Sequence, residues 1–193
     1  MVRPRALLAL LPAVALVLGP SPGPSAAALG TACTITGTGV HDELHGTPGD
    51  DVICGLGGRD DLFGAGGNDI LRGGPGDDNL TGGTGNDRLI GGDGGDFFSD
   101  GPGDDLIKGG GGRDYNFGGG GNDRWFGGAG PDSFIDFRGH DSISGGAGND
   151  TCLATYDTHP NDRINGGDGT DVWYADPGDD HTKVEKKIAC FAE

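Results

Sequence analysis

Glutamate is nearly absent from this chain of 193 residues. Only three of its 30 acidic residues are glutamate, namely Glu43, Glu185 and Glu193, and all the others are aspartate. An acidic surface that serves solubility alone usually mixes the two, so the bias indicates a task that needs the shorter carboxylate. Against 13 lysines and arginines, the acids give a formal net charge of −17. This charge argues against nucleic acid as a partner.

The chain also lacks a long apolar run. Its longest covers residues 6–18, is interrupted by Pro12, and is too short to span a bilayer. Arg3 and Arg5 precede this run, and three alanines follow it at residues 26–28. This order predicts a signal peptide over residues 1–28, with an anchoring helix as the alternative. We therefore expect a secreted, extracellular protein with no membrane span after removal of the signal, and a formal charge of −19.

Cysteine is scarce, and no two cysteines have the CxxC spacing of zinc or redox sites. The four are Cys33, Cys54, Cys152 and Cys190. An even number in an exported chain predicts disulfides, for which three connectivities are possible. We expect Cys33–Cys54 and Cys152–Cys190, because each bridge would tie a tail outside the repeats to a terminal turn.

Apolar residues make up only 33% of the chain, whereas glycine contributes 44 residues and proline 11. A chain of this composition without a period would stay disordered. This chain has a period. Counted in nines from Gly37, it gives 13 unbroken repeats to Leu153, a three-residue insertion at 154–156, and three more repeats to Lys183.

Three positions of the repeat hold their residue type. Position four is glycine in 14 of the 16 repeats, position eight is apolar in 14, and position six is aspartate in all. The exceptions at position eight are Asn116 and Thr182. A low-complexity tract would not keep three columns in phase. We expect Asn116 to be satisfied by a hydrogen bond or by a water molecule, or else to mark a register shift that buries Tyr115 and Phe117.

The position-six aspartates are the candidate metal ligands. Ca²⁺ binds six to eight oxygens from carboxylates and carbonyls, and glycine lets backbone carbonyls approach an ion closely. The candidates are Asp42, Asp51, Asp60, Asp69, Asp78, Asp87, Asp96, Asp105, Asp114, Asp123, Asp132, Asp141, Asp150, Asp162, Asp171 and Asp180.

These blocks resemble the Gly-Gly-x-Gly-x-Asp-x-apolar-x nonapeptide of the RTX (repeats-in-toxin, haemolysin-type) calcium-binding family. The resemblance implies an all-β fold: a right-handed parallel β-roll, or β-solenoid, with two repeats per turn and about eight turns. It also implies multiple Ca²⁺ ions between stacked turns, with each aspartate serving the ions above and below it. The β-roll would cover residues 37–183, between an N-terminal cap at 29–36 and a C-terminal cap at 184–193.

No catalytic constellation is present in the sequence, and we predict no enzyme. Paired acids such as Asp50-Asp51 could suggest a glycosidase, but they recur at repeat positions five and six, which favours calcium binding. We expect a structural or adhesive extracellular role. The alternatives are a module that binds a polysaccharide or a cell surface, and an accessory or remnant of a secreted hydrolase.

One face of the expected roll carries outward apolar side chains, and we expect it to be a partner surface or a site of self-association. The bland alternative is a scatter of tolerated surface residues. The residues are Phe63, Phe97, Tyr115, Phe117, Ile135 and Leu153.

Overall fold

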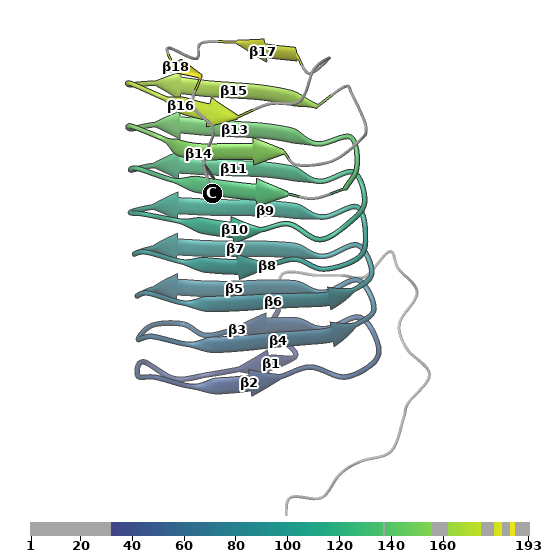
Figure 1. The fold of residues 1–193 in the computed structure, drawn as a ribbon. Coiled ribbons are helices and arrows are strands. Elements are labelled where there is room, and N and C mark those ends of the chain that lie inside the picture. Colours follow the sequence, from purple (N-terminus) through teal and green to yellow (C-terminus); the bar gives the residue numbers. More distant parts are fainter. Residues whose placement is uncertain (1–31, 137, 156–161, 175–179, 183–185, 188–193) are drawn as a thin grey trace, which may run out of the picture. The chain divides into compact units, whose positions relative to one another are not determined.

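The computed structural model describes residues 32–136, 138–155, 162–174, 180–182 and 186–187, and within them it shows strands only. The strands form two parallel sheets of nine strands each, and within each sheet the strands stack along the axis of the roll. The strands of one sheet run in the direction opposite to those of the other (Figure 1). Among the described residues no helix is long and apolar enough to cross a membrane.

The two sheets take alternate strands of the chain, and we call them the odd sheet and the even sheet. The odd sheet contains β1 (Ile35–Thr36), β3 (Val52–Cys54), β5 (Ile70–Pro75), β7 (Arg88–Asp93), β9 (Leu106–Gly111), β11 (Arg124–Ala129), β13 (Ser142–Ala147), β15 (Arg163–Asp168) and β17 (Asp180–Thr182). The even sheet contains β2 (Glu43–His45), β4 (Asp61–Gly66), β6 (Asn79–Thr84), β8 (Phe97–Ser99), β10 (Tyr115–Phe117), β12 (Ser133–Asp136), β14 (Thr151–Thr155), β16 (Val172–Tyr174) and β18 (Lys186–Lys187).

Each nonapeptide supplies one strand. The sixteen repeats correspond to β2 through β17, and each strand pairs with the strand two repeats away, as in Leu62↔Leu80 and Leu89↔Ile107. The period-two alternation of a strand turns position eight inward and positions seven and nine outward. The predicted parallel β-solenoid, with two repeats per turn, is therefore confirmed.

The core is a single file of position-eight side chains between the two sheets. Eleven of them are at most 2% exposed: Ile53, Leu62, Leu71, Leu80, Leu89, Phe98, Ile107, Trp125, Phe134, Ile143 and Ile164. Full burial of such a side chain contributes about 1.5–3 kcal/mol. A core one residue thick leaves the turns to supply much of the remaining stability.

Asn116 occupies the core file without a register shift. It lies opposite Phe98 and Phe134 in the even sheet, as position eight requires, and it is 1% exposed. Its amide nitrogen donates a 3.2 Å hydrogen bond to Asp100 Oδ2. The first of the two expectations holds for the amide nitrogen, whereas Oδ1 has no hydrogen-bond partner among the described residues. No register shift occurs here, and Tyr115 and Phe117 stay exposed.

The repeat register slips in two places near the C-terminal end. In β14 the irregularity lies between Thr151 and Leu153, ahead of the insertion expected at 154–156, and Ala154 pairs with Ile135. In β17, Asp180 pairs with Arg163, although the repeat count would place it beside Asp162. These slips alter strand pairing at the end of the roll and leave the stack before β14 regular.

The N-terminal end is closed by β1 and a disulfide. Ile35 pairs with Ile53, and the Cys33–Cys54 bridge joins the incoming segment to β3 with a Cα–Cα distance of 5.9 Å. This is the pairing expected at that end.

The second expected bridge, Cys152–Cys190, stays a prediction, because Cys190 and the side chain of Cys152 lie outside the described residues. The signal peptide also stays a prediction, because residues 1–31 lie outside them.

Candidate calcium ladder

The position-six aspartates form two columns, one at each edge of the roll. The odd column precedes the odd strands and contains Asp51, Asp69, Asp87, Asp105, Asp123, Asp141 and Asp162; the even column contains Asp42, Asp60, Asp78, Asp96, Asp114, Asp132, Asp150 and Asp171. All are buried except Asp42, which is half-buried. The side chain of Asp180 is not described. Fourteen buried carboxyl groups in so small a structure need partners that compensate for the loss of their contacts with water.

One oxygen of these carboxylates accepts a hydrogen bond from the preceding turn of the roll. The backbone N–H of Asp60 donates to Asp78 Oδ1 at 2.7 Å, and the N–H of Asp78 donates in turn to Asp96 Oδ1 at 2.9 Å. The same contact crosses the insertion, from the N–H of Asp141 to Asp162 Oδ1 at 2.7 Å. The three extra residues therefore leave the aspartate column intact.

The other oxygen, Oδ2, has no hydrogen-bond partner within the described structure in ten of these residues: Asp60, Asp69, Asp78, Asp87, Asp96, Asp105, Asp114, Asp132, Asp150 and Asp171. Leaving a buried acceptor unsatisfied costs about 1–3 kcal/mol, and more for a charged group. A row of unsatisfied, hard anionic oxygens fits a hard cation that takes oxygen ligands, and Ca²⁺ is such a cation.

Burial also shifts the acidity of these groups. It raises the pKa of Asp96, Asp105 and Asp132 to about 7, and that of Asp69 and Asp114 to about 6. The backbone hydrogen bond to Oδ1 lowers the pKa in each case, but by less than burial raises it. Without a cation the columns tend to take up protons, because the charged form is poorly solvated.

Glycine at position one makes room for Oδ2. A Cβ placed on Gly82 would lie 2.5 Å from Asp87 Oδ2 and 2.6 Å from the carbonyl oxygen of Asp100. Any side chain there would displace the carboxylate or the neighbouring turn. The glycine therefore lets carboxylate and carbonyl oxygens converge on the same small volume.

The first turn of each column differs from the turns that follow. Thr38 donates to Asp42 Oδ2 from its backbone N–H at 2.6 Å and from its hydroxyl at 2.8 Å. Thr47 does the same for Asp51 Oδ2 at 2.7 and 2.8 Å. These two threonines at position two thus supply the hydrogen bonds that the interior aspartates lack.

A second ladder at position five was not expected from the sequence as a structural element. In the turns that precede the odd strands, the N–H of Asn68 donates to Asp50 Oδ1 at 2.7 Å, and the N–H of Asn86 donates to Asn68 Oδ1 at 2.8 Å. The series continues through Asp104 and Asn122. Aspartate or asparagine at 18-residue intervals was the signal that could have revealed it.

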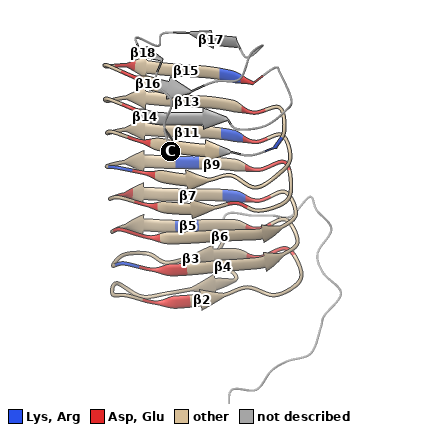
Figure 2. Cartoon of the chain, viewed as in Figure 1, with Lys and Arg blue, Asp and Glu red and all other residues tan. Residues whose placement is uncertain are grey.

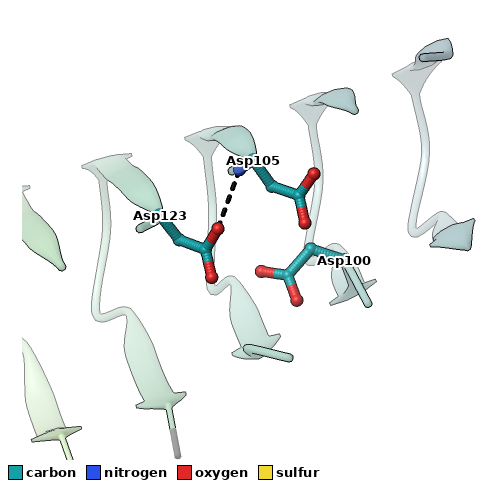
Figure 3. Close-up of side chains that lie close together, drawn as sticks. All are labelled: Asp100, Asp105 and Asp123. Atoms are coloured by element: carbon teal, nitrogen blue, oxygen red, sulfur yellow. Dashed lines mark hydrogen bonds between the residues drawn. The ribbon is translucent and has the colours of Figure 1, made fainter. Parts of the chain in front are cut away.

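Sequence reasoning also missed Asp100. It occupies position one, where most repeats have glycine, and it is fully buried. Its carboxylate lies beside those of Asp105 and Asp123, with ligand atoms of the three within 4.8 Å of one another (Figure 3). The replacement of a position-one glycine by an acid was the available signal.

A family model described as RTX calcium-binding nonapeptide repeat (4 copies) matches residues 36–71, 72–99, 90–125, 117–152 and 161–181. A search of curated proteins found no match. The family match covers most of the chain and coincides with the stacked turns and their aspartate columns. The chain therefore belongs to the RTX calcium-binding nonapeptide-repeat family, and its repeats bind multiple Ca²⁺ ions.

Proposed function

We propose that this protein is secreted, that it folds when Ca²⁺ enters its two aspartate columns, and that the loaded roll serves as an extracellular structural or adhesive element. The observation that carries the proposal is the row of buried Oδ2 atoms that have no hydrogen-bond partner in the described part of the chain. A bound cation would satisfy these oxygens, so binding energy becomes folding energy.

All sixteen position-six aspartates are proposed as ligands, with unequal contributions. The interior residues from Asp60 to Asp171 would depend most on the ions. Asp42 and Asp51 would contribute less, because threonine already satisfies their Oδ2 atoms. Asp180 is the weakest candidate, because β17 pairs it with Arg163. About nine or ten Ca²⁺ would neutralise the mature charge of −19.

The proposed secretion rests on the pattern of residues 1–28 and on the Cys33–Cys54 disulfide, which suits an oxidising compartment. N-terminal sequencing of protein from the culture medium tests it, and we expect the mature chain to begin near residue 29. The absence of enzymatic activity is likewise a proposal, and a hydrolase screen of the calcium-loaded protein tests it.

An adhesive role is favoured by the outer face of the odd sheet. From β5 to β15 its outward positions seven and nine carry five cations and no acid (Figure 2). We call these cations the basic stripe: Arg72, Arg88, Lys108, Arg124 and Arg163. Each odd strand from β5 to β11 carries one cation, and strands lie about 4.8 Å apart. The cations alternate between position nine (Arg72, Lys108) and position seven (Arg88, Arg124), so they form a staggered charged band.

A shallow groove lies within the basic stripe. Its lining includes Leu106, Lys108, Arg124 and Phe126, and the guanidinium of Arg124 lies 5.8 Å from the ring centroid of Phe126. Cations next to apolar surface suit the carboxylate and ring of an acidic sugar. Once Ca²⁺ neutralises the columns, the stripe would dominate the local field, so we propose an acidic polysaccharide as the ligand.

A calcium titration followed by circular dichroism and small-angle X-ray scattering tests the folding proposal. We expect β signal and compaction to rise together as Ca²⁺ is added. A chelated protein with the same β content and radius as the loaded one would overturn the proposal.

Binding of the loaded protein to alginate tests the adhesive role. The variant is Arg88→Ser plus Arg124→Ser, and the control is Arg59→Ser, which changes a residue in a turn.

A further inference from the structure

Two departures from the repeat meet inside the roll. Asp100 stands at position one in place of glycine, and Asn116 stands at position eight in place of an apolar residue. The two are 16 residues apart, and the amide nitrogen of Asn116 lies 3.2 Å from Asp100 Oδ2. Their exposed fractions are 0% and 1%. Since each departure alone would place a polar group in the core, their contact indicates one shared purpose.

The carboxylates around this contact have the spacing of metal ligands. Asp100, Asp105 and Asp123 each offer an oxygen, and these oxygens lie within 4.8 Å of one another. Two oxygens that both bind one Ca²⁺ at 2.3–2.6 Å can be at most about 5 Å apart. Figure 3 shows the three groups converging, with the N–H of Asp105 donating to Asp123 Oδ1 at 2.7 Å.

Asn116 adds an independent indication of a ligand. Its Oδ1 is buried and has no hydrogen-bond partner among the described residues. The oxygen and nitrogen of a carboxamide exchange places when its terminal torsion rotates by half a turn, so the head group that contacts Asp100 can present its oxygen there. A cation beside Asp100 would satisfy that oxygen, whereas an apolar core cannot.

We propose that Asp100, Asp105, Asp123 and Asn116 hold one Ca²⁺ on the core side of the odd column, in addition to the ions bound by the repeat turns. Three ligands come from the turns before β9 and β11, and the fourth comes from β10 of the even sheet. The ion would therefore join the two sheets in the middle of the roll. With three carboxylates around it, this site should bind more tightly than the turn sites, because affinity rises with ligand charge.

This proposal rests on the proposed calcium binding by the position-six aspartates, and a count of bound ions separates the two. Native mass spectrometry of the calcium-loaded chain is compared between wild type and Asp100→Gly plus Asn116→Leu, which restores the repeat pattern. We expect this variant to bind one ion fewer and to lose the tightest phase of a calorimetric Ca²⁺ titration. Asp93→Gly, which removes an exposed acid from position three, is the control and should keep the wild-type count.

Asp100→Asn decides the matter even if the double variant does not fold. It keeps the size of residue 100, removes its charge, and replaces one accepting carboxylate oxygen by an amide nitrogen that donates. The loss of one bound ion in Asp100→Asn, compared with the wild type, supports the site. An unchanged ion count in a folded variant would mean that Asp100 and Asn116 are only a hydrogen-bonded core pair, and would overturn the proposal. A wild-type chain that binds no Ca²⁺ would instead refute the proposed function.

Discussion

Asp78 Oδ1 accepts a 2.7 Å hydrogen bond from the backbone N–H of Asp60, while Asp78 Oδ2 is buried with no hydrogen-bond partner among the residues that the structure describes. The first contact fixes the carboxylate against the preceding turn and aims it consistently. The second oxygen is left available to a bound cation. The same arrangement, with Oδ1 hydrogen-bonded and Oδ2 unsatisfied, recurs along both columns. The backbone contacts hold the carboxylates in place, but the roll depends on cations to compensate for their buried charge.

Removing one interior aspartate should weaken folding far more than removing its exposed neighbour. Asp78→Ala deletes a ligand that would serve two adjacent ions and should shift the Ca²⁺ midpoint of folding strongly upward. Asp77→Asn removes the same charge from an exposed position five, keeps an acceptor for the Gly95 N–H, and should shift the midpoint little. The wild-type midpoint should lie at about 10⁻⁴–10⁻³ M, the range of extracellular modules, and Mg²⁺ should not substitute for Ca²⁺. Equal shifts for the two variants in a circular dichroism titration would contradict the ladder.

Acid should partly replace calcium in the apo protein. Burial raises the pKa of Asp96 and Asp105 to about 7, whereas unfolded aspartate titrates near 3.8. The folded state then binds more protons than the unfolded state between these values. The stability of the apo roll is therefore greatest below about pH 4 and is lost as pH rises towards about 7.

Circular dichroism of chelated protein between pH 4 and pH 8 measures this effect. We expect more β signal at the acidic end, and tighter Ca²⁺ binding as pH rises, since the ion and protons compete for the same oxygens. A chelated protein whose β content increases with pH would show that these carboxyl groups are not buried as described.

The N-terminal turns should depend least on calcium. Thr38 and Thr47 satisfy the Oδ2 atoms of Asp42 and Asp51, and the Cys33–Cys54 bridge holds β1 against β3. Asp42→Ala should therefore shift the Ca²⁺ midpoint less than Asp96→Ala. Replacing both cysteines by serine should destabilise the loaded protein by about 2–4 kcal/mol, measured by urea unfolding in excess Ca²⁺. An Asp42→Ala effect as large as that of Asp96→Ala would be inconsistent with a threonine-satisfied end.

The even sheet should mediate any self-association. Phe97, Tyr115 and Phe117 are each about two-fifths exposed, and the rings of Phe97 and Phe117 lie 5.5 Å apart. Phe97→Ser plus Tyr115→Ser should reduce concentration-dependent association in Ca²⁺, measured by sedimentation, whereas Phe126→Ser on the odd sheet should not. A wild-type protein that stays monomeric at high concentration would leave these residues as ordinary surface.

The repeat made much of this structure predictable. A period of nine, with an apolar residue at position eight and aspartate at position six, requires a short strand after a glycine turn, and parallel stacking then aligns every second aspartate. The Cys33–Cys54 pairing followed because both residues lie at the start of the roll. These inferences succeed because each depends on one repeat and on its copy 18 residues away.

Other features depend on contacts that the period does not encode. The sequence could not show that Asn116 meets Asp100, because that contact joins two different repeat positions across the two sheets. Nor could it show that β14 slips between Thr151 and Leu153, ahead of the expected insertion, or that Asp180 pairs with Arg163. The sequence alone determined which residues repeat, and hence the strands and the aspartate columns. Only the tertiary structure decided which carboxylate oxygens stay unsatisfied, because that depends on how neighbouring turns pack against one another.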